Sequence, residues 1–204
     1  MKELHWAQQA AYPVLLALQL LPLFGGVLLY LLRRQPWAEN LGRAFFIAEL
    51  LLAIDLYRHI DAMSPALQLA ERADWLLYHT GADGVTALFV LVTALIGLLL
   101  SLYQPARERL GHGALQMLIL LAQSALMAML VTTNLLWFAA ASALELVIVA
   151  VLLRIWVSGD AGDLAYARFI QYQGFGLLLF VAGAVVLAWG HADATGGSWS
   201  FDLH

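Results

Sequence analysis

The sequence contains no cysteine and few charged residues. The lack of cysteine excludes disulfide bonds, cysteine-ligated zinc and iron–sulfur clusters. Charged residues make up 12% of the 204 positions and hydrophobic residues 63%, whereas soluble domains are about 25% charged and about 45–50% apolar. The net charge of −4 argues against nucleic acid as a partner. The composition therefore predicts an integral membrane protein.

Six apolar segments approach the length of about 20 residues that crosses a bilayer as a helix. They are Tyr12–Leu32, Ala44–Ile60, Val85–Tyr103, Ala114–Thr132, Leu135–Val157 and Ala165–Trp189. The residues before the first segment are polar and the apolar run after them is long, so we interpret that run as a retained helix. We expect an all-α integral membrane protein with about six transmembrane helices, forming one membrane domain over residues 1–204.

The arginines predict the orientation of these helices. Seven of the ten basic residues flank alternate loops: Arg33, Arg34, Arg43, Arg107, Arg109, Arg154 and Arg168. Because cytoplasmic loops are enriched in arginine and lysine, we assign these loops to the cytoplasm. An even number of helices then places both termini on the non-cytoplasmic side. We expect a multi-pass protein of the bacterial inner (cytoplasmic) membrane.

The loop between the second and third helices, residues 61–84, is longer than most links in a compact bundle. Its aromatic and apolar residues, Trp75 among them, favour an interfacial segment that anchors the chain at the membrane surface. Asp83 lies just before the third helix, where its carboxylate can cap the helix. Thr132–Asn134 separates two apolar runs, which predicts a tight turn between the fourth and fifth helices.

Three motifs together resemble a known family. They are "LPLFGGVLLYLLRR" at Leu21–Arg34, "ERADWLLYHTGADG" at Glu71–Gly84 and "YARFIQYQGFG" at Tyr166–Gly176. Because it carries these three motifs in this order, the chain resembles the N-terminal six-helix part of the antiporter-like chain M of NADH-quinone oxidoreductase (respiratory complex I). The resemblance covers nearly the whole chain, which is a truncated and divergent version of that family's pattern.

The resemblance implies a place in a proton-pumping membrane arm. In that family a glutamate on the fifth helix pairs with a lysine on a broken seventh helix. This chain stops after the sixth expected helix, and its only lysine, Lys2, lies outside the expected helices. Arginine stays protonated and cannot replace a titrating lysine. We therefore expect an accessory or structural subunit of a proton-coupled complex, which is not a complete pump by itself.

Two intramembrane carboxylates are candidates for a proton path, Glu145 and Glu49. Glu145 resembles the family's fifth-helix glutamate, but counting from Asn134 places that position nearer Ala143. Two residues along a helix turn a side chain by about 200°. Glu145 is therefore either a proton carrier or a neutral glutamic acid satisfied by a partner subunit or by Arg154. Glu49 is either a polar contact between helices or a relay residue.

Four further residues are candidates for subunit contact or anchoring: Gln123, Arg168, Trp75 and Asp83. In the family, the positions of Gln123 and Asn134 often carry Glu and Asp, so both changes remove a titratable group. The six histidines lie at expected helix ends, in loops or near the termini, so we expect no haem. We assign no metal, cofactor or catalytic residue.

The expected partners are the lipid bilayer and other membrane subunits, above all a full-length antiporter-like chain, together with a soluble catalytic subunit in a host complex that contains one. Two alternatives stay open for the host complex. One is a DabA–DabB type complex for energy-coupled accumulation of inorganic carbon (CO2/bicarbonate). The other is a split chain M, of which this chain would be a proton-conducting half that uses Glu145.

Overall fold

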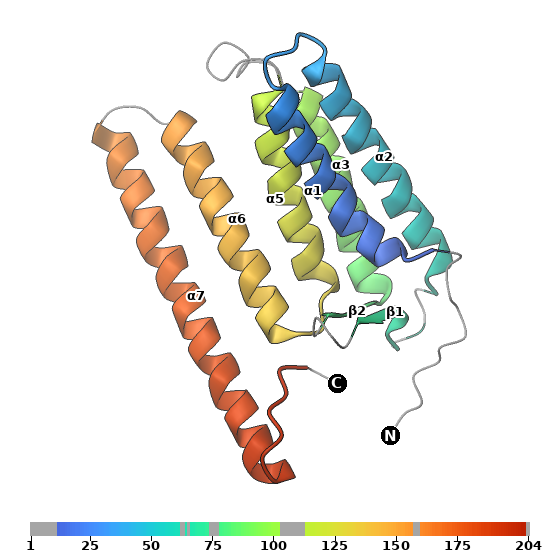
Figure 1. Cartoon of the computed structure of the whole chain (residues 1–204), viewed down its shortest axis with the longest axis vertical. Helices are drawn as coiled ribbons and strands as arrows, with labels where there is room; N and C mark the ends of the chain where they lie inside the picture. Colours follow the sequence, from blue (N-terminus) through green and yellow to red (C-terminus); the bar gives the residue numbers. More distant parts are fainter. Residues whose placement is uncertain are drawn as a thin grey trace.

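The structure is a computed structural model, and it describes residues 12–61, 64, 66–73, 78–102, 113–156 and 160–202. These residues form six helices and one two-stranded sheet (Figure 1). In chain order they are α1 (Val14–Leu32), α2 (Ala38–His59), β1 (Gln68–Ala73), β2 (Tyr78–Ala82), α3 (Gly84–Leu102), α5 (Ala114–Val131), α6 (Leu135–Trp156) and α7 (Asp160–Thr195).

The helices confirm the expected all-α membrane fold. Among the described residues, α1, α3, α5, α6 and α7 are long and apolar enough to cross a membrane. α2 is not among these five, because it carries charged residues along its length: Glu39, Arg43, Glu49, Asp55 and Arg58. It nevertheless packs against α1, α3 and α5 as a member of the bundle. The side of the membrane on which each end lies stays a prediction.

Two helices are longer than the apolar runs from which they were predicted. α2 begins at Ala38 instead of Ala44, and the helix expected over Ala165–Trp189 runs from Asp160 to Thr195. The hydrophobic run marks the part of a helix that lies in hydrocarbon. The backbone hydrogen bonds of a helix satisfy its own polar groups, so the helix continues beyond that part.

The helices form a bundle, which consists of α1, α2, α3 and α5, and an arm, which consists of α6 and α7. α1, α2, α3 and α5 pack together around two clusters of buried side chains. α6 packs on α5, and α7 packs on α6 at the outer side (Figure 1). The close approach of α1 to its neighbours depends on Gly25 and Gly26, because a Cβ there would overlap Phe45 and Leu121.

The loop over residues 61–84, predicted to be an interfacial segment, contains an antiparallel hairpin. β1 and β2 pair with Arg72 opposite His79 and Ala73 opposite Tyr78. The hairpin supplies backbone hydrogen bonds where the chain crosses the end of the bundle, and such groups need partners when they are covered. Trp75, the expected anchor, lies outside the described residues.

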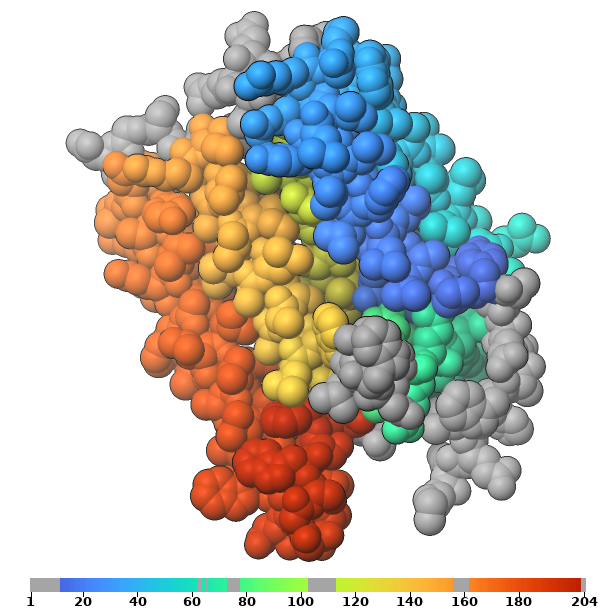
Figure 2. Space-filling model, viewed as in Figure 1, coloured from blue at the N-terminus to red at the C-terminus, as the bar shows by residue number. Residues whose placement is uncertain are grey.

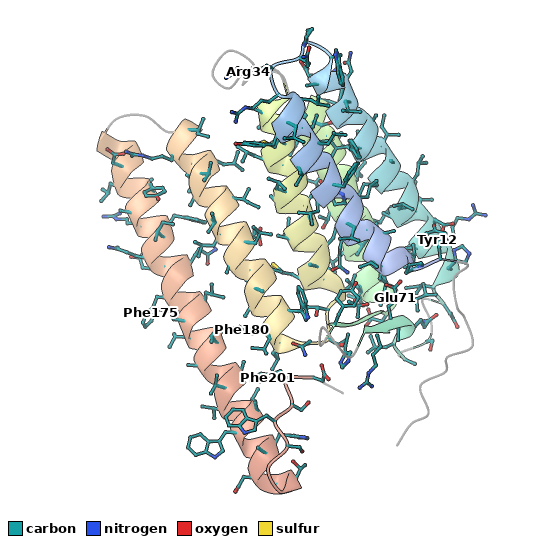
Figure 3. The ribbon with its side chains drawn as sticks, in the orientation of Figure 1. Tyr12, Arg34, Glu71, Phe175, Phe180 and Phe201 are labelled. Carbon is teal, nitrogen blue, oxygen red and sulfur yellow. The ribbon has the colours of Figure 1, made fainter. Side chains whose placement is uncertain are left out.

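Side chains at the hairpin end cap three helices. Glu71 accepts hydrogen bonds from the N–H groups of Leu15 and Leu16, both at 2.9 Å, at the start of α1. In Figure 3, Glu71 lies at this end of the bundle and Arg34 at the opposite end. Asp83 Oδ1 accepts from the N–H of Thr86 at 2.7 Å, which confirms the expected cap of α3.

The third cap belongs to the tight turn between α5 and α6. Asn134 Oδ1 accepts from the N–H of Leu136 at 2.9 Å. The chain after α7 returns to this turn, where Asn134 Nδ2 donates to Asp202 at 2.8 Å and the Leu135 N–H donates to the Phe201 carbonyl. A carboxylate oxygen of Asp202 also lies 2.7 Å from Nδ1 of His79 on β2. These contacts tie the end of the chain to both the turn and the hairpin.

The Asp83 cap makes the stability of the folded protein depend on pH. The Thr86 N–H bonded to its carboxylate lowers the pKa of Asp83 below the ordinary value of 3.8. Its stabilisation is therefore complete above the ordinary pKa and is lost as the pH falls through the lowered, folded-state pKa. We expect Asp83→Ala to lower the stability at neutral pH by about 1 kcal/mol. The measurement is thermal unfolding of the detergent-solubilised protein.

The difference between Asp83→Ala and the wild type should shrink as the pH is lowered below 3.8, since protonation removes the same interaction. Asp193→Ala, which removes an exposed carboxylate near the end of α7, is the control. Equal stability of Asp83→Ala and the wild type at neutral pH would contradict the role of this cap.

Candidate functional site

A fully buried carboxylate lies in the middle of the bundle. Glu49 has an exposed fraction of 0% and stands near the midpoint of α2. It belongs to the buried seam of that helix, which also contains Gly42, Phe46, Ala53 and Leu56. The spacing of three or four residues places all five on one helix face. The sequence of α2 therefore turns Glu49 inward, against α3 and α5.

The polar neighbour of Glu49 is Gln123 of α5. The Gln123 side chain is 3% exposed, and its Nε2 donates to the backbone carbonyl of Thr93 on α3 at 3.4 Å. Neither carboxyl oxygen of Glu49 has a hydrogen bond of ordinary geometry within the described part of the chain. An ionised carboxylate is costly in this setting, while a neutral carboxyl group can donate its proton to a neighbouring amide.

Gly97 of α3 makes room for this pair. A Cβ at position 97 would overlap the Gln123 amide group, so the side-chain amide occupies the space that glycine leaves. Thr93 and Gly97 lie one helical turn apart on the same face of α3. Glu49, Gln123 and this face of α3 together form a polar site of three helices, which we call the Glu49 site.

Glu145 lies in a second, separate place. It is half-buried and lines a cavity of about 380 Å³ between α6 and α7. Ser142 and Gln173 add polar groups to this lining, although the Ser142 hydroxyl already donates to the Phe138 carbonyl at 2.8 Å. Phe180 of α7 packs on Phe138 of α6, with ring centroids 5.0 Å apart, at the same cavity (Figure 3).

The two carboxylates do not share a site. Glu49 is held among α2, α3 and α5, whereas Glu145 lies between α6 and α7, on the other side of α5 (Figure 1). Arg154 was a possible partner of Glu145, but it pairs with Asp163 and its guanidinium lies 5.8 Å from the centre of the Tyr166 ring.

The remaining candidate residues have different positions. Gln123 is inside the bundle instead of on a contact surface, and Asp83 is a helix cap. Arg168 is exposed in the first part of α7. The described residues contain no group of three or more His, Asp and Glu side chains that could hold a metal ion.

Sequence reasoning missed that Glu49 and Gln123 are neighbours inside the bundle. The buried spacing of α2 and the glycine at position 97 were visible in the sequence. They indicate that each helix has a close-packed face, but not which helix that face meets. Glu71 was noted only as part of a motif, and its role as the cap of α1 depends on a contact across 55 residues of chain.

No protein-family model matches the sequence. The chain is 30% identical over 209 residues to an NAD(P)H-quinone oxidoreductase chain 4 of Microcystis aeruginosa, covering 95% of this chain and 35% of that protein. It is 29% identical over 185 residues to a chain 4 of the same enzyme from a Synechococcus species, covering 87% and 34%. It is 25% identical over 189 residues to F(420)H(2) dehydrogenase subunit M of Methanosarcina mazei, covering 90% and 38%.

These relatives confirm the resemblance to the chain M type of respiratory membrane subunit. The chain spans about a third of the length of the curated relatives it matches. The fold is similar to a chain of the membrane-bound sulfane sulfur reductase, an archaeal respiratory membrane complex. That match has a TM-score of 0.75 and 17% identity, and it covers 91% of this chain and 38% of the other.

We expect two glycine substitutions to affect the stability of the protein differently, because only one of the two glycines borders the Glu49 site. Gly97→Ala should destabilise the bundle by about 1–3 kcal/mol, because the added methyl group displaces the buried Gln123 amide. Gly174→Ala on α7 is the matched control, because nothing lies within 4 Å of its added Cβ. Helix propensity should make the control neutral or slightly stabilising. Thermal unfolding in detergent measures both.

A double substitution tests the mechanism. In Gly97→Ala/Gln123→Ala the space of the amide is empty, so the second substitution should cost less in the Gly97→Ala background than in the wild type. Strict additivity of the two effects would contradict the overlap at this site.

Proposed function

We propose that the chain is an accessory or structural membrane subunit of a multi-subunit, proton-coupled complex related to the membrane arm of complex I. The observation that carries this proposal is the surface of α7. This helix of 36 residues packs on α6 and leaves most of its apolar side chains exposed. Tyr172, Phe175 and Leu178 are 75%, 63% and 69% exposed, and Figure 3 shows Phe175 on the outer side of α7.

The names of the relatives indicate which class of protein could cover the exposed face of α7. An apolar helix face is compatible with lipid as well as with protein. The curated relatives are named as a chain of NAD(P)H-quinone oxidoreductase and as a subunit of F(420)H(2) dehydrogenase, and the solved neighbour is a respiratory membrane complex. We therefore assign the α7 face to a larger antiporter-like membrane subunit, in the inner membrane of a bacterium.

The charged groups favour an accessory role over pumping. The single lysine of the 204 residues, Lys2, precedes α1. The arginines Arg43 and Arg154 pair with Glu39 and Asp163. A proton relay needs several groups of tunable pKa in reach of one another. Within the described residues, Glu49 and Glu145 lie on opposite sides of α5 and do not form such a series.

Proton conduction is the second candidate function. The Glu49 site supports it, because a buried carboxyl group near the middle of a helix bundle, with no ion-pair partner among the described residues, can hold and release a proton. Glu145 supports a variant of this idea, since it lines a cavity beside which a further subunit or the rest of a split chain could add a basic group.

Co-purification tests the accessory role. The tagged chain is extracted from its native membrane in mild detergent, and the recovered proteins are identified by mass spectrometry. We expect a full-length antiporter-like chain. A soluble catalytic subunit recovered with it would name the reaction, and a carbonic-anhydrase-like chain would indicate the DabA–DabB type of host. Recovery of the chain alone would contradict the proposal.

Activity of the recovered complex separates the two candidate functions. If the role is accessory, Glu49→Gln and Glu145→Gln complexes keep the proton-coupled activity of the wild type. If either carboxyl group carries protons, its glutamine variant assembles normally but loses activity, because an amide does not titrate. Tyr172→Ala, on the exposed face of α7, is the complementary variant, for which we expect weaker assembly.

The absence of cysteine from the sequence makes the orientation directly measurable. We propose that the hairpin end of the bundle faces away from the cytoplasm, since exposed Arg33 and Arg34 lie at the opposite end. Single cysteines at exposed Ser198 and exposed Gln35 mark the two ends. In intact cells an impermeant maleimide should label Ser198→Cys and leave Gln35→Cys unlabelled until the membrane is opened. The reverse pattern would overturn this topology.

A further inference from the structure

A furrow runs along the surface of the bundle between α1 and α6. Both helices pack on α5. In Figure 2, α5 is visible as a strip at the bottom of the gap between them. The space has a volume of about 670 Å³ and is lined by α1, α5, α6 and the hairpin. It is distinct from the cavity of Glu145 and from the Glu49 site, which lie elsewhere around α5.

Small side chains create the furrow. Its floor is formed by Ala125 and Ala128 of α5, and the α6 wall contains Ala140 and Ala141. Each contributes only a methyl group, so α6 and α1 leave a gap that larger side chains would close. Leucines of α1 form the opposite wall. An empty apolar space loses dispersion contacts and does not attract water, so hydrocarbon is its natural filling.

Most of the polar groups of the furrow lie toward its hairpin end, and Ser124, beside the alanine floor, uses its hydroxyl to donate to the Gln19 carbonyl. At the hairpin, its lining contains Glu71, Arg72, Tyr78, Gln19 and Trp137. The Tyr78 hydroxyl accepts a hydrogen bond from Gln19 Nε2 at 2.7 Å, and burial raises the pKa of Tyr78 to about 12, so the phenol remains a neutral donor. The Tyr78 and Trp137 rings meet edge to face, with centroids 6.1 Å apart.

The polar end has the composition of a membrane–water interface. Tyrosine and tryptophan rings lie at headgroup level in membrane proteins. Arg72 is exposed at this end, and its planar guanidinium matches the geometry of a phosphate. The Glu71 carboxylate beside it is engaged in capping α1. One end of the furrow thus suits a phosphate group and the rest suits an alkyl chain.

We propose that this furrow is a phospholipid site, in which an acyl chain lies over Ala125 and Ala128 and the lipid phosphate is bound at Arg72. We infer the ligand from the positions of the polar and the apolar parts of the furrow lining. A phospholipid carries its phosphate at the interface and its apolar chain directly below, which is the order of Arg72 and the alanine floor. The lipid would fill the gap between α1 and α6 and support the attachment of the arm to the bundle.

The test uses the full chain purified in mild detergent, with bound lipids counted by native mass spectrometry. We expect phospholipid to remain bound to the wild type. Ala140→Phe should remove it, because Ala140 is exposed in the furrow wall and a ring there occupies the space of the acyl chain. Ala182→Phe, at an exposed alanine of α7, is the matched control and should retain the lipid.

The headgroup contact has its own pair of variants. Arg72→Gln should weaken binding of added phospholipid about fivefold, the effect of one arginine near a lipid headgroup. Arg58→Gln, an exposed arginine in the last turn of α2 at the same end of the bundle, should not. Equal loss in both arginine variants, or equal lipid counts in both phenylalanine variants, would overturn the proposal.

A cross-linking measurement does not depend on the folding of the phenylalanine variants. A benzoylphenylalanine at position 144, a partly exposed leucine at the furrow, should form an adduct with phospholipid after irradiation in the native membrane. An adduct with an isoprenoid quinone or with a neighbouring protein helix instead would identify a different occupant and reject the phospholipid site.

Discussion

The packing of α5 is the constraint on which the rest of the structure depends. α5 contacts α1, α2, α3 and α6 and also touches β2, so it is the common neighbour of both the bundle and the arm. Different residues serve its different sides: Gln123 faces the Glu49 site, Ser124 donates to the Gln19 carbonyl of α1, and Ala128 forms the floor of the furrow. Helices without a hydrophobic driving force between them associate through close packing and polar contacts, and α5 supplies both.

Several polar side chains of the described residues lie inside the bundle or at the starts of helices. In the bundle, Glu49 and Gln123 are covered by three helices. At the hairpin end, Glu71, Asp83 and Asn134 receive the unpaired N–H groups of three helix starts. A bilayer offers backbone groups no water, so such groups must find partners inside the protein. The hairpin and the returning chain end, joined by His79 and Asp202, hold these caps in place.

The bundle and the arm differ in the helix surfaces that they bury and expose. α1, α2, α3 and α5 bury their contacts among themselves, whereas α7 has α6 beside it and exposes large apolar side chains along its length. An apolar helix with one open face can be covered by lipid or by another membrane helix. The likeness to chains of respiratory membrane complexes agrees with the proposed role as a subunit.

The sequence by itself determined the membrane class, the helices, the Asp83 cap, the tight turn before α6 and the chain M likeness, because apolar runs, cap residues and ordered motifs are local signals. The tertiary structure decided the rest. The Glu71 cap and the contact between Glu49 and Gln123 each join segments far apart in the chain, and the hairpin over residues 68–82 joins two short neighbouring strands. Helical periodicity says which face of α2 is buried, but it carries no information on the helix that will cover it. That choice is made by the packing of all the helices together, with glycine at position 97 leaving the space that the Gln123 amide fills.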